Sequence, residues 1–231
     1  MGAIAENLKA IKERIAQAAR RAGREPGAVR LVAVSKTKPA EAVAEAYACG
    51  QGIFGENYVQ ELVAKKEELP PGICWHFIGN LQSNKVRQIA GKVDLIHSVD
   101  RLSLAREIDR QWGALGKVCE ILVQVNISRE ETKGGTGCEE LLGLVREAAQ
   151  LPHLKVVGLM TMPPFFDDPE GARPFFRKLR ELAAEVERAG IAGVTMRELS
   201  MGMSGDFETA VEEGATLVRV GSALFGERHY R

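Results

Sequence analysis

The stretch LVAVSKTKPAEAVAEAYACGQGIFG, residues 31–55, sets a pattern that the rest of the chain repeats. Its first five residues, LVAVS, form a short, continuous apolar run, which is typical of a strand buried on both faces of a parallel sheet. A helical stretch follows Pro39 and stops at Gly50, and GIFG (residues 52–55) is apolar again. The stretch therefore predicts a strand, a helix and a second strand parallel to the first.

Further apolar runs continue this alternation to the end of the chain. With the first two they make eight, at residues 31–35, 52–55, 75–79, 94–99, 119–127, 155–160, 197–201 and 216–221. A helical stretch follows each of the first seven runs, at residues 39–50, 58–69, 84–90, 102–112, 139–150, 172–189 and 207–213, and the chain end follows the eighth. Eight such units predict a single α/β domain over residues 1–231, a (β/α)8 TIM barrel. An open doubly wound sheet remains the alternative, because the number of strands does not exclude it.

The barrel is expected to carry an extra helix at its front. Ile4, Leu8, Ile11 and Ile15 recur at helical spacing with charged residues between them, and the pattern ends near Gly23. No internal repeat, linker or shift in composition divides the chain.

Composition narrows the classes of function. Hydrophobic residues make up 45% and charged residues 27% of the 231, which is typical of a soluble globular protein. The 31 Lys and Arg balance the 31 Asp and Glu, so no basic surplus favours a nucleic-acid partner. The N-terminus lacks the apolar stretch of a signal peptide, and no run approaches the ~18 apolar residues of a membrane span. We therefore expect a cytoplasmic protein without a membrane partner.

The cysteines point to no metal centre. Cys49, Cys74, Cys119 and Cys138 are scattered without a C-x-x-C pair, so neither a zinc site nor a disulfide framework is indicated. We expect four reduced thiols.

Active sites of this fold lie at the carboxyl ends of the strands. Lys36 comes directly after the first apolar run. At the barrel mouth a lysine is partly desolvated, which favours the neutral amine that attacks an aldehyde. The alternative is a solvated loop lysine, and only one of Lys36 and Lys38 can point inward.

The loops after the seventh and eighth runs are the common phosphate site of this fold. Both contain glycine and serine: Ser200, Gly202, Ser204 and Gly205 in the first, Gly221 and Ser222 in the second. Glycine lets backbone N–H groups approach an anion, and serine adds hydroxyl donors. An ordinary turn would explain either loop alone. KGGTG (residues 133–137) lacks the spacing of a P-loop and is interpreted as a flexible loop.

Three other polar residues fall near strand ends. Arg219 lies inside the last apolar run, where a permanent cation needs a polar partner or a ligand; a salt bridge to Asp206 is the structural alternative. His76 is more readily a hydrogen-bonded core histidine than a ligand. Asn57 could simply cap a helix.

The motifs themselves point to a family. VAVSKTKP, FGENYVQE, WHFIGNLQSNK, VNISREETKGG, GLMTM and LSMGMSGDFETAVEEGATLVRVGSALFG occur in order between residues 32 and 226. In them the chain resembles the YggS/PROSC family of pyridoxal 5'-phosphate homeostasis proteins. The resemblance implies a barrel similar to the N-terminal domain of alanine racemase, with pyridoxal phosphate (PLP) held as an aldimine by Lys36.

The resemblance also implies the remaining cofactor contacts. Ser200, Gly221 and Ser222 would contact the phosphate, and Arg219 the pyridine nitrogen. Asn57, His76 and Met201 match the pattern near the cofactor. No catalytic residue and no metal ligand is expected.

The implied function is to buffer PLP and deliver it to apo-enzymes, without robust turnover. An Arg at the pyridine nitrogen keeps the ring unprotonated and weakens its carbanion stabilisation. This disfavours transaminase chemistry. Racemisation stays open on this ground, but it needs an acid/base group on the second face of the ring, and a chain ending at Arg231 is expected to have no second domain that supplies one. A PLP-dependent, racemase-like amino-acid enzyme and a phosphosugar enzyme remain the alternatives.

Overall fold

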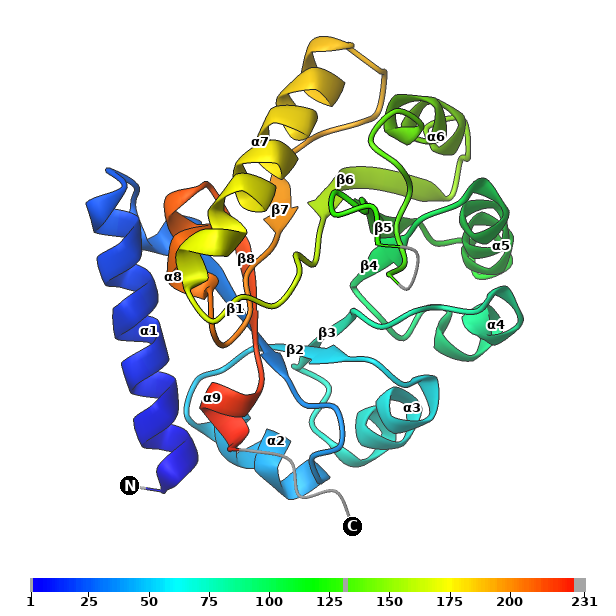
Figure 1. The fold of residues 1–231 in the computed structure, drawn as a ribbon. Coiled ribbons are helices and arrows are strands. Elements are labelled where there is room, and N and C mark those ends of the chain that lie inside the picture. Colours follow the sequence, from blue (N-terminus) through cyan, green and yellow to red (C-terminus); the bar gives the residue numbers. More distant parts are fainter. Residues whose placement is uncertain (1, 131–132, 227–231) are drawn as a thin grey trace.

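A computed structural model describes residues 2–130 and 133–226 of the chain. Eight parallel strands close into a barrel in sequence order (Figure 1). The strands are β1 (Arg30–Val34), β2 (Ile53–Glu56), β3 (Cys74–Phe77), β4 (Leu95–Val99), β5 (Cys119–Gln124), β6 (Leu154–Met160), β7 (Glu198–Ser200) and β8 (Leu217–Val220). β8 pairs with β1, with Val32 opposite Arg219. The closed barrel confirms the predicted fold class, and the open-sheet alternative is wrong.

Helices surround the strands. They are α1 (Ala3–Arg21), α2 (Ala40–Ala48), α3 (Val59–Glu68), α4 (Val86–Ile89), α5 (Leu102–Gly113), α6 (Leu141–Ala148), α7 (Arg173–Arg188), α8 (Phe207–Glu212) and α9 (Ser222–Phe225), with 3₁₀ turns η1 (Pro26–Ala28), η2 (Ser83–Lys85) and η3 (Pro169–Ala172). Two details differ from the sequence prediction. The helix expected over residues 84–90 is split between η2 and α4, and the short α9 follows β8, where no helix was expected. The chain end at Arg231, which was expected to follow the eighth strand, lies outside the described residues.

The strands are apolar because both of their faces are buried. All five residues of β4 and all four of β8 are buried. A small cluster that includes Val32, Leu122 and Leu217 fills the barrel interior, and a larger one lies between strands and helices. This packing explains why continuous apolar runs, rather than alternating ones, indicated the strands.

The predicted extra helix is α1, which lies along α8 and α9 (Figure 1). Its buried residues include Leu8, Ile11 and Ile15 at helical spacing. The Asn7 side chain donates to the Leu224 carbonyl at 3.0 Å, so α1 also holds the end of the last βα unit.

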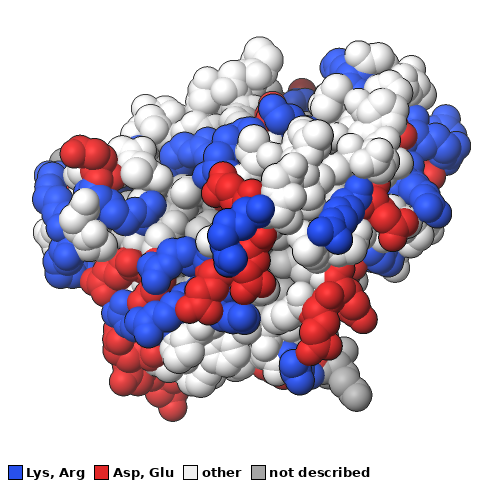
Figure 2. Space-filling model, turned by 90° about the horizontal axis from the view of Figure 1, so that it is seen from above, with Lys and Arg blue, Asp and Glu red and all other residues white. Residues whose placement is uncertain are grey.

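The surface carries both charges. On the face shown in Figure 2, Lys and Arg side chains are interspersed with Asp and Glu. No helix among the described residues is long and apolar enough to cross a membrane. Within the same residues, no group of three or more His, Cys, Asp or Glu is arranged to hold a metal ion. All four cysteines are free thiols.

Candidate functional site

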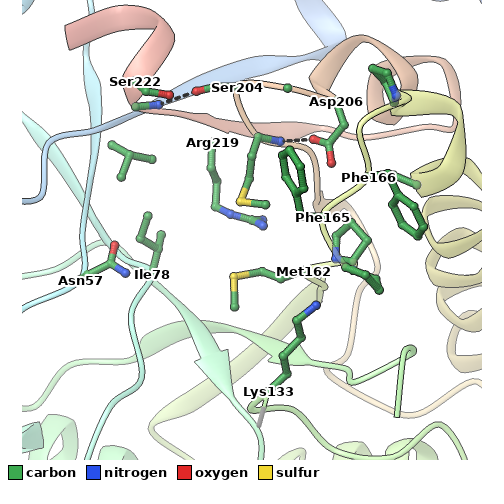
Figure 3. Close-up of a pocket in the computed structure, with 18 of the residues that line it drawn as sticks. Asn57, Ile78, Lys133, Met162, Phe165, Phe166, Ser204, Asp206, Arg219 and Ser222 are labelled. Carbon is green, nitrogen blue, oxygen red and sulfur yellow. Dashed lines mark hydrogen bonds between the residues drawn. The ribbon is translucent and has the colours of Figure 1, made fainter. Parts of the chain in front are cut away.

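A cavity of about 510 Å³ opens at the carboxyl end of the barrel. One part of its lining is polar and comes from the ends of β1, β2 and β8 and the loop after β7. The other part is apolar and comes mainly from the loop after β6. Figure 3 shows Arg219 and Lys133 extending into it from opposite sides. The lining residues from the predicted site are Lys36, Asn57, Arg219, Gly221 and Ser222.

The first strand delivers Lys36 to this cavity. Lys36 follows β1 by two residues and is partly buried. The neighbouring Lys38 instead donates to the carbonyls of Phe225 and Gly226, at 3.1 and 3.2 Å. Of the two lysines in the KTK sequence, the structure therefore places Lys36 in the main cavity and anchors Lys38 to the end of α9.

Backbone N–H groups and hydroxyls gather where β8 ends. The N–H groups of Gly221 and Ala223 donate to the Ser204 hydroxyl oxygen at 3.3 and 3.4 Å. These bonds are longer than the usual 2.7–3.2 Å, so a charged oxygen would be a better acceptor for both groups. A side chain at Gly221 would press against Val34, at 3.3 Å, so glycine lets the ends of β8 and β1 approach closely. Ser204, Gly221 and Ser222 together line a cradle suited to an anion.

Ser200 does not line the cavity. The structure buries it completely at the end of β7, where its hydroxyl contacts His97 and Arg219. Met201 is also fully buried, in the hydrophobic core. Ser204 lies in the same loop and was noted but not selected as a cofactor contact from the sequence. Of the serines in this loop, it is the one that lines the cavity. The signal that could have found it is its place in the loop itself, beyond the strand end, between Gly202 and Gly205.

Arg219 enters the cavity from the interior of the barrel. Its guanidinium donates to the Ser200 hydroxyl at 2.5 Å and to the Thr161 carbonyl at 3.0 Å. Burial lowers the pKa of Arg219 to about 10, although the Asp206 carboxylate opposes this shift, so the group stays cationic at neutral pH. No carboxylate of the described residues forms an ion pair with it within 4.0 Å, which removes the predicted alternative of a direct salt bridge to Asp206. The remaining guanidinium N–H donors are available to a ligand.

Two buried histidines continue the hydrogen bonds behind Arg219. His97 Nδ1 lies 2.9 Å from the Ser200 hydroxyl, and His97 Nε2 lies 2.9 Å from His76 Nδ1. In the tautomer that carries its proton on His97 Nε2, the Ser200 hydroxyl accepts from Arg219 and donates to His97 Nδ1, and His97 Nε2–H donates to His76 Nδ1. Burial lowers the pKa of both imidazoles, that of His76 to about 3. His76 is thus a neutral, hydrogen-bonded core residue outside the cavity lining, and it reaches the site only through His97 and Ser200.

One polar atom of the cavity has no partner within the described residues. Asn57 Oδ1 is buried and accepts no hydrogen bond. A buried polar atom without a partner is costly, so a donor supplied by a ligand would satisfy it. Asp206, whose pKa is raised by burial, accepts from the Met203 N–H at 2.6 Å and lies on the opposite wall.

The remaining wall of the cavity was little indicated by sequence patterns. Met162, Phe165 and Phe166 line it from the loop after β6, and Phe165 is 88% exposed. Lys133 enters from the KGGTG segment, and its Nζ lies 3.0 Å from Glu130. This segment is bound to the end of β5, since the Gln124 and Asn126 side chains donate to the Gly134 and Lys133 carbonyls. The interpretation of KGGTG as a flexible loop did not select Lys133 as a residue that lines the cavity.

The fold and the site together define a class of barrel protein. A family model described as alanine racemase, N-terminal domain, matches residues 7–229. An alanine racemase of Corynebacterium glutamicum superimposes with a TM-score of 0.69 at 18% identity, over 96% of this chain and 60% of that one. At that identity the likeness concerns the fold alone.

Closer relatives narrow the class. The chain is 50% identical over 226 residues to the pyridoxal phosphate homeostasis protein of Aquifex aeolicus, which covers 97% of this chain and 98% of the relative. A solved structure of PipY of Synechococcus elongatus PCC7942 with PLP bound superimposes with a TM-score of 0.84 at 39% identity, over 96% of this chain and 100% of that one. The chain belongs to the family of pyridoxal phosphate homeostasis proteins, which confirms the family predicted from its motifs.

Proposed function

We propose that this protein binds PLP in the cavity at the carboxyl end of its barrel, buffers it, and passes it to apo-enzymes. The observation that carries the proposal is the joint presence of Lys36, the Ser204–Gly221–Ser222 cradle and the cation Arg219 around one cavity. The names of the relatives and the PLP bound to PipY support the same ligand.

These residues fit the chemical groups of PLP one by one. Lys36 would hold the aldehyde end of PLP, where its amine would condense with the aldehyde carbon and release the oxygen as water. The N–H groups of Gly221 and Ala223 and the hydroxyls of Ser204 and Ser222 hold the phosphate. Asn57 Oδ1, which lacks a donor among the described residues, can accept a hydrogen bond from the ring hydroxyl.

Arg219 determines which chemistry this site favours. A guanidinium cannot accept a proton from the pyridinium, so Arg219 at the ring nitrogen keeps that nitrogen unprotonated. An unprotonated ring withdraws electrons weakly, and proton abstraction at an attached amino acid is correspondingly slow. A carrier needs only imine formation and exchange, whereas transamination needs a strongly electron-withdrawing ring, so Arg219 disfavours a transaminase and suits the carrier.

Reductive trapping tests the covalent attachment. Wild-type protein incubated with PLP should absorb near the visible edge and lose this band on borohydride treatment. Peptide mass spectrometry should then locate the reduced adduct on Lys36. Lys38→Ala is the matched control, because Lys38 contacts the end of α9. A reduced adduct on Lys38, or on no lysine, would contradict the assignment.

A transfer assay tests the function. Holo-protein is incubated with an apo-enzyme that requires PLP, with a trap for free cofactor, and recovery of enzyme activity is followed. Racemase and transaminase assays on the holo-protein run in parallel. Reactivation without amino-acid turnover supports the carrier. No reactivation, together with turnover at an ordinary enzymatic rate of about 1 per second or faster, would contradict the carrier function and indicate an amino-acid enzyme.

A further inference from the structure

A buried ionic cluster lies beneath the turn that carries Lys36. We call it the turn-support cluster; it consists of Ser35, Glu56, Glu61 and Lys65. The Lys65 Nζ lies 2.6 Å from Glu56 Oε1 and 3.2 Å from Glu61 Oε2, and its side chain is only 8% exposed. Glu56 is fully buried and also accepts from the Ser35 hydroxyl at 2.7 Å.

The cluster holds the main chain on both sides of Lys36. The Ser35 carbonyl accepts from Lys65 Nζ at 2.7 Å, in addition to the turn hydrogen bond from the Lys38 N–H at 3.0 Å. The Thr37 N–H donates to Glu61 Oε2 at 2.7 Å. Thr37 has a φ of +62°, in the left-handed region that a β-branched residue rarely adopts. The bond from Glu61 therefore stabilises a strained backbone conformation directly after Lys36.

Stability alone does not account for this arrangement. Burying an ion pair costs desolvation that its Coulomb attraction often fails to recover, and apolar residues of similar volume frequently serve as well or better. Glu56 Oε2 moreover has no hydrogen-bond partner among the described residues, and burial raises the pKa of Glu56 in spite of Lys65. An arrangement with these costs is best explained by what it positions.

We propose that Glu56, Glu61 and Lys65 are positioning residues that fix the backbone at Ser35 and Thr37 and thereby direct the Lys36 side chain into the cavity. The inference rests on the proposed function, because it concerns the amine that would react with PLP. None of the three residues lines the cavity, so their effect passes through the turn. Loss of the cluster should impair covalent attachment while leaving the phosphate cradle intact.

The test compares two ligands that differ only at the reacting carbon. PLP forms an imine, whereas pyridoxine 5'-phosphate has an alcohol in place of the aldehyde and binds without one. In Lys65→Met the dissociation constant for PLP should rise about tenfold or more, with a smaller trapped fraction on Lys36 after borohydride. The dissociation constant for pyridoxine 5'-phosphate should stay within about twofold of wild type. Lys66→Met, one residue along α3, is the matched control and should behave as wild type with both ligands.

A variant at a second, partly exposed position keeps the test informative if Lys65→Met does not fold. Glu61 is 31% exposed, so Glu61→Ala should fold and still lose the acceptor for the Thr37 N–H. Glu61→Gln keeps an oxygen acceptor and should restore part of the PLP affinity, and exposed Glu67→Ala is the control. Equal weakening of both ligands, or no weakening in either variant, would overturn the inference. A wild-type protein that forms no imine with PLP would overturn the proposed function together with it.

Discussion

Ser204 and Ser200 differ in what their hydroxyls contact, although Ser200 ends β7 and Ser204 lies in the loop that follows it. Ser204→Ala should weaken PLP binding by about ten- to a hundredfold, because a hydrogen bond to a charged group contributes ~1.5–3 kcal/mol. Ser200→Ala should have a smaller effect on PLP but should lower the free energy of unfolding by about 1–3 kcal/mol, since it leaves buried donors and acceptors on Arg219 and His97 unpaired. Equilibrium dialysis and urea unfolding measure the two effects. Stronger loss of PLP in Ser200→Ala, at unchanged stability, would assign the phosphate to Ser200.

Ser200 and Ser204 show which features of the site could not be predicted from the sequence. Lys36 and Gly221 could be selected because each follows an apolar run at a strand end, and the fold fixes where strand ends point. The same rule noted Ser200 and Ser204 together, and only the family resemblance singled out Ser200, yet the Ser200 side chain is buried against Arg219 and His97. The rule gives the end of a strand but not the direction of a side chain, and it does not reveal Lys133, which reaches the cavity from a loop held by Gln124 and Asn126.

The buried histidines predict a pH dependence of stability. Burial lowers the pKa of His76 to about 3 and that of His97 well below its usual value. Below about pH 6.5 the unfolded chain takes up a proton on each imidazole and the folded chain does not, so stability falls as the pH falls. Each histidine should contribute about 1.4 kcal/mol per pH unit.

His76→Gln isolates this contribution. Its amide oxygen can still accept from His97, but it does not titrate, so the slope of unfolding free energy against pH should be flatter by about 1.4 kcal/mol per unit between pH 6 and 4.5. Urea unfolding at several pH values measures the slope. The control is His153→Gln, at a position where the side chain is 39% exposed. Identical slopes in wild type and His76→Gln would contradict a neutral, buried His76.

Strands were predicted better than helices. All eight apolar runs coincide with strands, because burial on both faces makes each run recognisable without its partners. The stretch over residues 84–90 is less regular: it contains η2 and α4, which together replace the single predicted helix. α9 could not be foreseen as a separate helix, since its four residues hold too few turns for a periodic pattern.

The contact between α7 and α8 depends on Glu213, whose side chain is only 6% exposed. It lies within 3.0–3.3 Å of Arg173, Arg177 and Arg180, all from α7. Glu213→Gln should lower the free energy of unfolding by about 1–2 kcal/mol, because it leaves the three guanidinium groups without their shared carboxylate. Exposed Glu187→Gln, on the same helix α7, is the control. Equal stability of the two variants would show that water solvates the three guanidinium groups as favourably as the Glu213 carboxylate does.

Glu213 also gives this contact a pH dependence. Burial by itself would raise the pKa of Glu213, but hydrogen bonds from Arg177 and Arg173 outweigh it and the pKa is lowered from its usual 4.5. A carboxyl with a lowered pKa in the folded state stabilises the protein above its unfolded pKa and loses that effect as the pH falls through the folded value. The difference between wild type and Glu213→Gln should therefore shrink below about pH 4.5, as followed by urea unfolding.

The eight-stranded sheet is complete only when its last strand joins its first. β8 pairs with β1 over four residues, from Arg30 opposite Leu217 to Ala33 opposite Val220. α1, from the start of the chain, packs on α8 and α9 near its end. The cavity likewise combines Lys36 after β1 with Gly221 after β8. The cavity is therefore complete only when β8 is paired with β1 and the barrel is closed.

Because the first and last strands close one barrel, residues 1–231 should unfold as a single domain. Scanning calorimetry should show one transition, with equal calorimetric and van't Hoff enthalpies. Because PLP would bind only the closed barrel, it should shift the whole transition upward, by the equivalent of about 2.7 kcal/mol at a hundred times its dissociation constant. Lys36→Ala should reduce the shift without splitting the peak. Two separate transitions, with PLP moving only one of them, would show that part of the chain unfolds independently of the site.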